Sequence, residues 1–481
     1  MKKNFLYNFL LTSSNLLFPL LTFPYLSRIL GADGIGICNF ILSYGQNYTI
    51  VAALGIPVYG IREIAKVGDD KEKRSRLFFE LLSIHIILTL FFLLLYFASI
   101  FFYADLREYK ELAILGSSLI LFNVFSIEWL FAGISNFKYI TIRSLIIRFL
   151  SVIAIFLVVR SREDFYIYFV IIVLTSLVTV SMDVYYARKF ISRRVTLTMK
   201  GALSHLKAVT LLGAYMVFTN IYSVLPTTLL GFLSTKSAVG YYFGANRIIR
   251  MVISIFSALT IVLIPRLNIA VEQHKSQEYL SLINKSLNIV ISFGIPATAF
   301  IFLLANPLVM LLAGGDFLNS VLVIKIMAPI ILSVAFAQVF VLLILSANRK
   351  DKQMVMLSIM GMVISLSINV IFIPYYAEIS TGFSQLVSEI IVTFLAFIFA
   401  KKVLDFQFPT KSFLLNLLCV IPFALVAYLS MWLFDDNFLI LLSSAFLCSL
   451  YFLIYQIYLI KNSFVMEAVS PIFKRFNIVH K

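Results

Sequence analysis

The sequence is poor in the residues that build soluble domains and catalytic sites. Only 13% of its 481 residues are charged, and it holds three cysteines, four histidines and two tryptophans. Cys38, Cys419 and Cys448 lie in apolar segments without a pairing pattern, so the sequence suggests neither a disulfide framework nor a thiolate metal site. It also lacks a phosphate-binding glycine loop, a zinc-type His/Glu cluster and a nucleophile elbow. We therefore expect no enzyme, no cofactor and no metal site.

Long polar loops are missing as well. Every connection between apolar segments is short, which leaves no room for a soluble catalytic or nucleotide-binding domain. The N-terminal stretch MKKNFLYNFLLTSSNLLF imitates a signal peptide, but no small-residue cleavage site follows it, so we interpret it as a first membrane span. Any function must then be carried out within the membrane.

Apolar residues dominate what is present. They make up 61% of the chain, against about 45–50% in an average soluble domain, and the mean hydropathy is +0.99. A bilayer core needs about 20 apolar residues per helix, and this length predicts an all-α polytopic membrane protein with about 14 transmembrane helices. The predicted spans are 8–27, 35–57, 77–103, 112–133, 144–160, 165–187, 208–233, 241–265, 283–305, 318–346, 354–376, 379–400, 413–434 and 438–460.

Positive charge follows this map of spans. The net charge is +16, and 28 of the 39 lysines and arginines fall on the side of the N-terminus, against five on the other side and six within the spans. Short cytoplasmic loops are enriched in Lys and Arg, so we predict that both termini, and the loop with six basic residues between Arg62 and Arg76, are cytoplasmic. The excess charge thus sets topology and attracts anionic membrane lipid, and nucleic acid is not an expected partner.

A weak internal repeat divides the chain. Segments about 205 residues apart keep a common register over two spans and their loops; the matched pairs are Asn15 and Asn220, Gly36 and Gly240, and Ile64 and Ile269, and Pro57 and Pro265 end the corresponding spans. A unit of six spans is even in number, so its two copies run in the same orientation. We predict an N-terminal six-helix lobe (1–207), a C-terminal six-helix lobe (208–402), and two additional helices with a cytoplasmic tail (403–481).

Polar residues inside spans are the candidate functional groups. Arg247 and Arg250 share one face of the eighth span, together with Asn246. An arginine at the centre of a spanning helix costs about 2.5–3.5 kcal/mol on insertion scales, so a pair of them needs a compensating partner or role. Lys325 and Arg148 are further basic candidates, although both could extend to the membrane interface. A cavity lined by these groups would favour an anionic solute, because guanidinium groups bind phosphate bidentately.

Acidic residues in the spans are fewer. Each could neutralise a basic residue on a facing helix, or bind a coupling proton or sodium ion, and the sequence leaves both roles open. The candidates are Glu128, Asp183 and Glu389. Prolines break the first span of each half, where a broken helix suits a gate or hinge. These prolines are Pro19, Pro24 and Pro226.

Three stretches near the N-terminus carry a family resemblance. They read PYLSRILGADGIGICNFILS, GIPVYGIREIAK and KEKRSRLFFELLS, within residues 24 to 83. They resemble the polysaccharide-transporter branch of the multidrug/oligosaccharidyl-lipid/polysaccharide exporter superfamily, in particular the Wzx-type flippases of O-antigen and capsule repeat units. The strings L-G-A-D-x-x-G and Y-G-x-R-E-I-A-K are fairly specific to that branch.

The resemblance implies a fold, a substrate and a location. It implies a V-shaped pair of six-helix lobes around a cationic cavity that alternates access across a bacterial inner membrane. The substrate would be an oligosaccharide on undecaprenyl pyrophosphate, moved from the cytoplasmic to the periplasmic leaflet. A coupling ion, proton or sodium, and a polysaccharide polymerase would be partners by analogy with relatives, and no ion-binding residues can be carried over.

Two other functions compete with this interpretation. A multidrug or small-metabolite antiporter of the same superfamily would favour acidic and aromatic groups for cationic drugs, whereas the deep positions here are richer in basic groups. A membrane-embedded polysaccharide polymerase or ligase is a more distant alternative. Such a protein needs a large outer loop, and the outer loops here are short.

Overall fold

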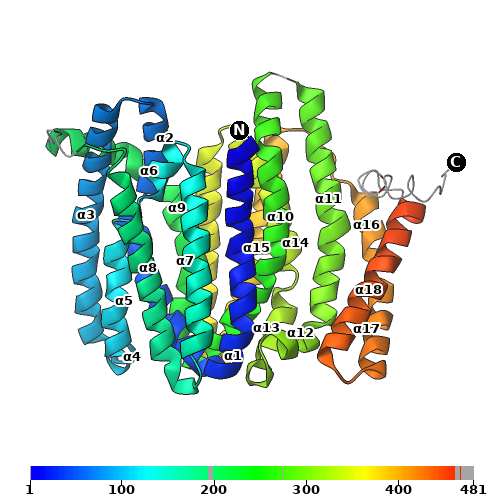
Figure 1. The fold of residues 1–481 in the computed structure, drawn as a ribbon. Helices are drawn as coiled ribbons and strands as arrows, with labels where there is room; N and C mark the ends of the chain where they lie inside the picture. Colours follow the sequence, from blue (N-terminus) through cyan, green and yellow to red (C-terminus); the bar gives the residue numbers. More distant parts are fainter. Residues whose placement is uncertain (1, 193–194, 196–198, 274, 461–465, 467–481) are drawn as a thin grey trace. The chain divides into compact units, whose positions relative to one another are not determined.

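The protein is helical in every part that the structure describes. The computed structural model describes residues 2–192, 195, 199–273, 275–460 and 466 and shows no strand among them (Figure 1). Packing divides the chain into two compact units. Unit 1 holds the residues up to Phe243 together with Met362–Thr381, and unit 2 holds Gly244–Gly361 and the residues from Gly382 onward. The predicted lobe boundary at residues 207/208 follows a repeat and not packing, so it stays a prediction.

The helices follow one another with short links. Unit 1 contains α1 (Lys2–Ala53), α2 (Ile56–Val67), α3 (Lys71–Phe102), α4 (Ala104–Glu108), α5 (Lys110–Asn123), α6 (Glu128–Gly133), α7 (Phe137–Val158), η1 (Arg162–Asp164), α8 (Phe165–Ala187) and α9 (Met199–Leu233). Helix α10 (Lys236–Glu272) begins in unit 1. Unit 2 continues with α11 (Ser276–Leu303), α12 (Ala305–Leu312), η2 (Gly315–Phe317), α13 (Ser320–Met327), α14 (Ile330–Ala337), η3 (Gln338–Ser346), the two ends of α15 (Asp351–Val403), α16 (Thr410–Cys419), α17 (Ile421–Leu433), α18 (Asn437–Tyr455) and η4 (Gln456–Ile460), while the middle of α15, Met362–Thr381, belongs to unit 1.

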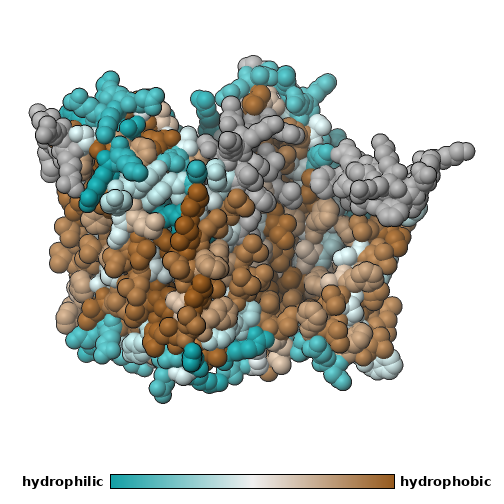
Figure 2. Space-filling model, viewed as in Figure 1, coloured by the Kyte–Doolittle hydropathy of each residue, from teal (hydrophilic) through white to brown (hydrophobic). Residues whose placement is uncertain are grey.

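Every predicted span falls on helical structure, and the chain is a multi-pass membrane protein. Among the described residues, nine helical segments are long and apolar enough to cross a bilayer, and one of them, α15, consists of two helices that meet at a kink at Ala377 and contains two predicted spans. The exposed side chains of these helices are largely apolar. Figure 2 shows them as a band that is bounded by polar residues at both helix ends.

Several helices do not coincide with the approximate spans that the sequence predicts, for identifiable reasons. The fifth span was expected to begin at residue 144, but α7 begins at Phe137 because the Asn136 side chain accepts a bond from the Tyr139 amide and caps the helix. The fourth span is interrupted between α5 and α6, and the thirteenth between α16 and α17. Apolar periodicity alone does not register such breaks, since the residues on either side remain apolar.

The L-G-A-D-x-x-G motif builds a close helix crossing in unit 1. Gly31 bends α1 through a left-handed conformation, with φ 67°. After this bend, a Cβ on Gly36 would lie 1.8 Å from the Lys236 carbonyl oxygen, and a Cβ on Gly240 would lie 2.0 Å from the Ala32 carbonyl oxygen. Glycine is therefore required at both positions for the two backbones to approach.

The contacts at this crossing are reciprocal. Ala32 and Lys236 are 204 residues apart, as are Gly36 and Gly240. Gly36 contacts Lys236, and its repeat counterpart Gly240 contacts Ala32, the repeat counterpart of Lys236. Such exchange is the pattern of a two-fold, self-complementary contact. The crossing thus follows the predicted repeat register at these positions.

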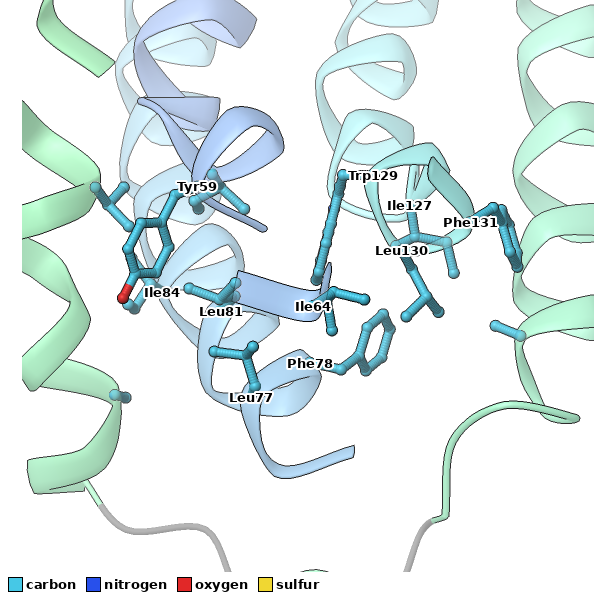
Figure 3. Close-up of a cluster of buried hydrophobic side chains, with 14 of the residues drawn as sticks. Tyr59, Ile64, Leu77, Phe78, Leu81, Ile84, Ile127, Trp129, Leu130 and Phe131 are labelled. Carbon is cyan, nitrogen blue, oxygen red and sulfur yellow. The ribbon is translucent and has the colours of Figure 1, made fainter. Parts of the chain in front are cut away.

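The Y-G-x-R-E-I-A-K motif packs the short helix α2 against α6. A Cβ on Gly60 would lie 2.4 Å from the Trp129 ring, and a Cβ on Gly133 would lie 2.7 Å from Ile64, so each helix supplies a glycine to receive the other's side chain. Trp129 stacks on Phe78 of α3, with ring centroids 5.5 Å apart, inside the apolar cluster drawn in Figure 3. Helices α2 and α6 lie at one end of unit 1, here called the α2 end, and α4 lies at the opposite or α4 end (Figure 1).

The C-terminal helices belong to unit 2. Helices α16, α17 and α18 pack on α11, where Phe293 meets Phe452 with ring centroids 5.4 Å apart. Cys419 and Cys448 are buried in the same apolar cluster, and the cysteines are unbridged. Both therefore act as small core side chains.

Candidate functional site

The two arginines of the eighth span lie on α10. Arg250 is exposed, and its Nε donates a hydrogen bond to Asn246 Oδ1, 3.3 Å away and one turn earlier. Arg247 and Asn246 are half-buried. Because α10 begins at Lys236, Arg250 lies about 21 Å along the helix at 1.5 Å per residue. Arg250 pairs with no carboxylate among the described residues, so its charge is oriented by an amide and left unneutralised.

Arg148 and Lys325 lie on different helices and in different units. Arg148 is half-buried on α7, and its Nη1 donates a 2.8 Å hydrogen bond to the buried Ser14 hydroxyl of α1. Lys325 is half-buried on α13 in unit 2. Arg148 belongs to unit 1, whereas Asn246, Arg247, Arg250 and Lys325 belong to unit 2. A single cavity lined by both sets stays a proposal.

Two of the predicted acids converge on an arginine that sequence reasoning missed. Arg143 of α7 is buried and bonds Asp183 of α8 through Nη1 and Glu128 of α6 through Nη2. Asp183 is fully buried and also accepts a 3.1 Å bond from the Tyr139 hydroxyl, while the Glu128 side chain is 48% exposed. Tyr139 stacks on Tyr186, with ring centroids 3.8 Å apart. We call Arg143, Asp183 and Glu128 the buried triad.

The position of Arg143 explains why it was missed. It lies one residue before the start predicted for the fifth span, so it was counted with the loop. Its partners are 15 and 40 residues away in the chain. A cap signal at Asn136 is the sequence feature that could have moved the helix start and placed Arg143 inside the helix.

A second polar cluster at the α2 end also went unpredicted. The Tyr59 hydroxyl lies 2.7 Å from His205 Nδ1, and His205 Nε2 lies 3.0 Å from Glu80 Oε2. Arg76 donates to the other Glu80 oxygen at 3.2 Å. Burial, reinforced by the Glu63 carboxylate, raises the pKa of Tyr59, so this hydroxyl stays protonated. The cluster ties α2, α3 and α9 together.

The remaining predicted residues lie within helices. Glu389 is buried on α15 of unit 2. Pro19 and Pro24 lie inside α1 and Pro226 inside α9, but the sharp bend of α1 is at Gly31, seven residues after Pro24. A gating or hinge role for the prolines stays a prediction.

Comparison with known proteins places these features in a family. A family model described as "Polysaccharide biosynthesis protein" matches residues 1–271, more than half of the chain. The chain belongs to this polysaccharide biosynthesis protein family. Both motifs that build the glycine crossing and the α2–α6 contact lie within the matched residues.

Similar sequences and structures agree with this family assignment. The chain is 25% identical to a protein of Escherichia coli (strain K12) named "Putative O-antigen transporter", over 84% of this chain and 97% of the relative. A protein of the same name from Shigella dysenteriae is 22% identical over 82% and 98%.

Solved structures show the fold. The lipid II flippase MurJ in an inward closed conformation superposes with a TM-score of 0.76 at 17% identity, covering 99% of this chain and 100% of that one. An inward-facing MATE transporter of the MOP superfamily gives a TM-score of 0.56 at 15% identity, covering 80% of this chain and 97% of that one. The family member thus has the all-α fold of MOP-superfamily transporters.

Proposed function

We propose that the protein is a flippase that moves undecaprenyl-pyrophosphate-linked oligosaccharide units from the cytoplasmic to the periplasmic leaflet of a bacterial inner membrane. It works by alternating access and is a transporter, not an enzyme. Both termini, and with them the α2 end, face the cytoplasm in this proposal. Family membership and the two relatives named as O-antigen transporters support the substrate class.

The observation that best supports the proposal is the exposure and charge pairing of Arg250. A membrane helix presents this guanidinium exposed, oriented by Asn246 and without a carboxylate among the described residues. A pyrophosphate brings the negative charge that such a group lacks, and a guanidinium can hold it bidentately. A flippase must also release its substrate, so an exposed cation suits the task better than a fully paired one.

The acids of the spans argue against a cationic drug as substrate. Asp183 is buried and bonded to Arg143, Glu128 is bonded to the same arginine, and Glu389 is only 8% exposed. None of these three carboxylates is left exposed and unpaired for a cationic ligand. This distribution favours the flippase over the multidrug antiporter of the same superfamily.

Contacts at the α4 end support alternating access. Lys236 Nζ lies 2.9 Å from Asp105 Oδ1, and Ser237 donates to Asp33 Oδ1 at 3.2 Å. Together with the glycine crossing, they join residues of the first predicted lobe to residues of the second. In our proposal these contacts close the periplasmic side and must separate when the cavity opens outward.

Genetic complementation tests the function. The gene is expressed in a bacterium that lacks its own O-antigen repeat-unit flippase, and surface polysaccharide is measured beside the abundance of the protein in the membrane. We expect polysaccharide to return, provided the strain makes a compatible unit. Several strains that make different repeat units are therefore tested, so that at least one unit is compatible with the protein. An abundant protein that restores none of them, but confers export of cationic dyes, would favour the antiporter instead.

A further inference from the structure

A cavity lies at the α2 end of unit 1, apart from the residues proposed to bind the flipped substrate. Its volume is about 360 Å³. It is bounded by the first turns of α3, the link between α5 and α6, and the end of α8 with the residues that follow. The lining residues are Phe78, Phe79, Leu82, Phe125, Ile127, Val184, Ala187, Arg188 and Ile191. All are apolar except Arg188, and Phe78 and Ile127 belong to the cluster drawn in Figure 3.

The wall of this cavity is firmly built. Buried Arg74 donates to the Phe190 carbonyl oxygen from Nε and Nη2, at 3.1 and 3.0 Å, and to the Gly68 carbonyl oxygen from Nη1 at 3.1 Å. The Ser192 amide donates to the Ser75 hydroxyl at 2.7 Å. These bonds fasten the segment after α8 to the start of α3, so the cavity does not depend on a loose loop.

Two cations follow the end of α8, and one of them, Arg188, lines the cavity. Arg188 lies over the Tyr185 ring, 5.8 Å from its centroid, and Lys189 lies over the Tyr186 ring at 4.9 Å. Both basic residues are exposed, and neither pairs with a carboxylate in the part of the chain that the structure describes. Arg188 both lines the cavity and stands at its mouth.

The position of the cavity along the helices indicates which layer of the bilayer it faces. Helix α3 begins at Lys71 and α8 ends at Ala187, so apolar helix gives way to charged residues at this level. Tyr185 is 69% exposed and Met182 37% exposed on the last turn of α8. Exposed tyrosines at the ends of membrane helices mark the headgroup region. An apolar cavity with a cationic rim at this depth matches a lipid that has an acyl chain and an anionic headgroup.

We propose that this cavity binds an anionic glycerophospholipid of the leaflet at the α2 end. One acyl chain enters between α3 and α8, and Arg188 holds the phosphate, with Lys189 adding charge at the rim. Basic pockets between membrane helices favour anionic headgroups in this way, and guanidinium matches phosphate geometry better than ammonium. The bound lipid stabilises the contact between α3 and the segment after α8, and it is not the transported substrate.

Native mass spectrometry of the purified full-length protein tests the proposal. Phosphatidylglycerol is compared with phosphatidylcholine of the same acyl chains, and Arg188→Ala is compared with Arg62→Ala, which removes an exposed arginine of α2 that does not line the cavity. Loss of a charge-assisted contact should weaken phosphatidylglycerol binding about tenfold in Arg188→Ala and leave Arg62→Ala close to wild type. Arg188→Lys should bind with intermediate strength.

A second variant separates the cavity from surface charge. Val184→Phe fills the cavity without changing charge and should also weaken binding, with the elution profile of the protein as a check on folding. Wild type binding both lipids equally, or Arg188→Ala and Arg62→Ala losing equally, would overturn the site. So would a well-folded Val184→Phe that binds normally. Stronger binding of undecaprenyl phosphate than of phosphatidylglycerol would indicate that the cavity holds the lipid tail of the substrate. That result would overturn our assignment.

Discussion

Arg143 and Arg250 are both arginines of membrane helices, and the fold holds them in opposite ways. Arg143 is buried and bonded to two carboxylates, whereas Arg250 is exposed and bonded to the Asn246 amide. The charge of Arg143 is neutralised inside unit 1, and that of Arg250 remains available to a ligand. A charge in an apolar helix therefore indicates a binding site only after its acidic partners have been sought.

Removing Asp183 should have the largest effect on stability. Asp183→Ala leaves a buried arginine with one half-exposed partner, and breaking a buried pair in this way costs about 3–5 kcal/mol. We expect low membrane abundance and a lower melting temperature for the purified protein. The double variant Arg143→Met with Asp183→Leu removes both charges and should recover most of the loss. An Asp183→Ala protein with normal abundance and melting would show that the triad carries little stability.

Arg250→Ala should give the reverse pattern, with normal abundance and impaired transport. A hydrogen bond to a charged group contributes about 1.5–3 kcal/mol, so transport should fall roughly 10- to 100-fold. Arg250→Lys keeps the charge without the bidentate fork and should be partly active. Surface polysaccharide divided by protein level in the complemented strain measures this. A degraded Arg250→Ala protein would instead assign the residue to structure.

The contrast also separates what the sequence could predict from what it could not. Arg247 and Arg250 were visible because they interrupt an apolar run, and Gly36 of the L-G-A-D-x-x-G motif because Gly240 follows it after 204 residues in the repeat. The partner of Asp183 was not visible, because it depends on how α6, α7 and α8 pack around Arg143. The Tyr59–His205–Glu80 cluster likewise joins positions up to 146 residues apart. Local pattern identified the spans, whereas charge pairing required the tertiary structure.

Lys236 is buried like Arg143, but its acidic partner is partly exposed. Its removal should therefore have an intermediate effect on stability. It is 9% exposed, its ammonium lies 4.2 Å from the Phe40 ring centroid, and its partner Asp105 is 39% exposed. Lys236→Ala should lower stability by about 1–2 kcal/mol, less than Asp183→Ala, because Asp105 can be rehydrated. If the pair closes the periplasmic side, cysteines at both positions that are joined by a reducible bifunctional thiol cross-linker should stop transport reversibly. Cross-linking with full transport would contradict that role.

Glu128→Gln should have the smallest effect among these changes. The Glu128 side chain is 48% exposed, so solvent screens its attraction to Arg143, and Asp183 still pairs with the arginine. We expect a loss of stability below about 1 kcal/mol. A shift in melting temperature as large as that of Asp183→Ala would mean that the two acids contribute equally to the buried triad.

The most direct measurement of the central claim follows the lipid itself. Purified wild-type and Arg250→Ala proteins are placed in liposomes that contain a polyprenyl-pyrophosphate-linked oligosaccharide, and a membrane-impermeant glycosidase or lectin reports how much of the sugar has crossed to the far leaflet. Our account predicts that wild type moves the sugar, that cross-linked Asp105→Cys/Lys236→Cys moves it only after the reducible cross-linker is cleaved, and that well-folded Arg250→Ala moves it at least tenfold more slowly. Wild-type and Arg250→Ala proteins translocating at the same rate would contradict the claim that this exposed arginine binds the substrate.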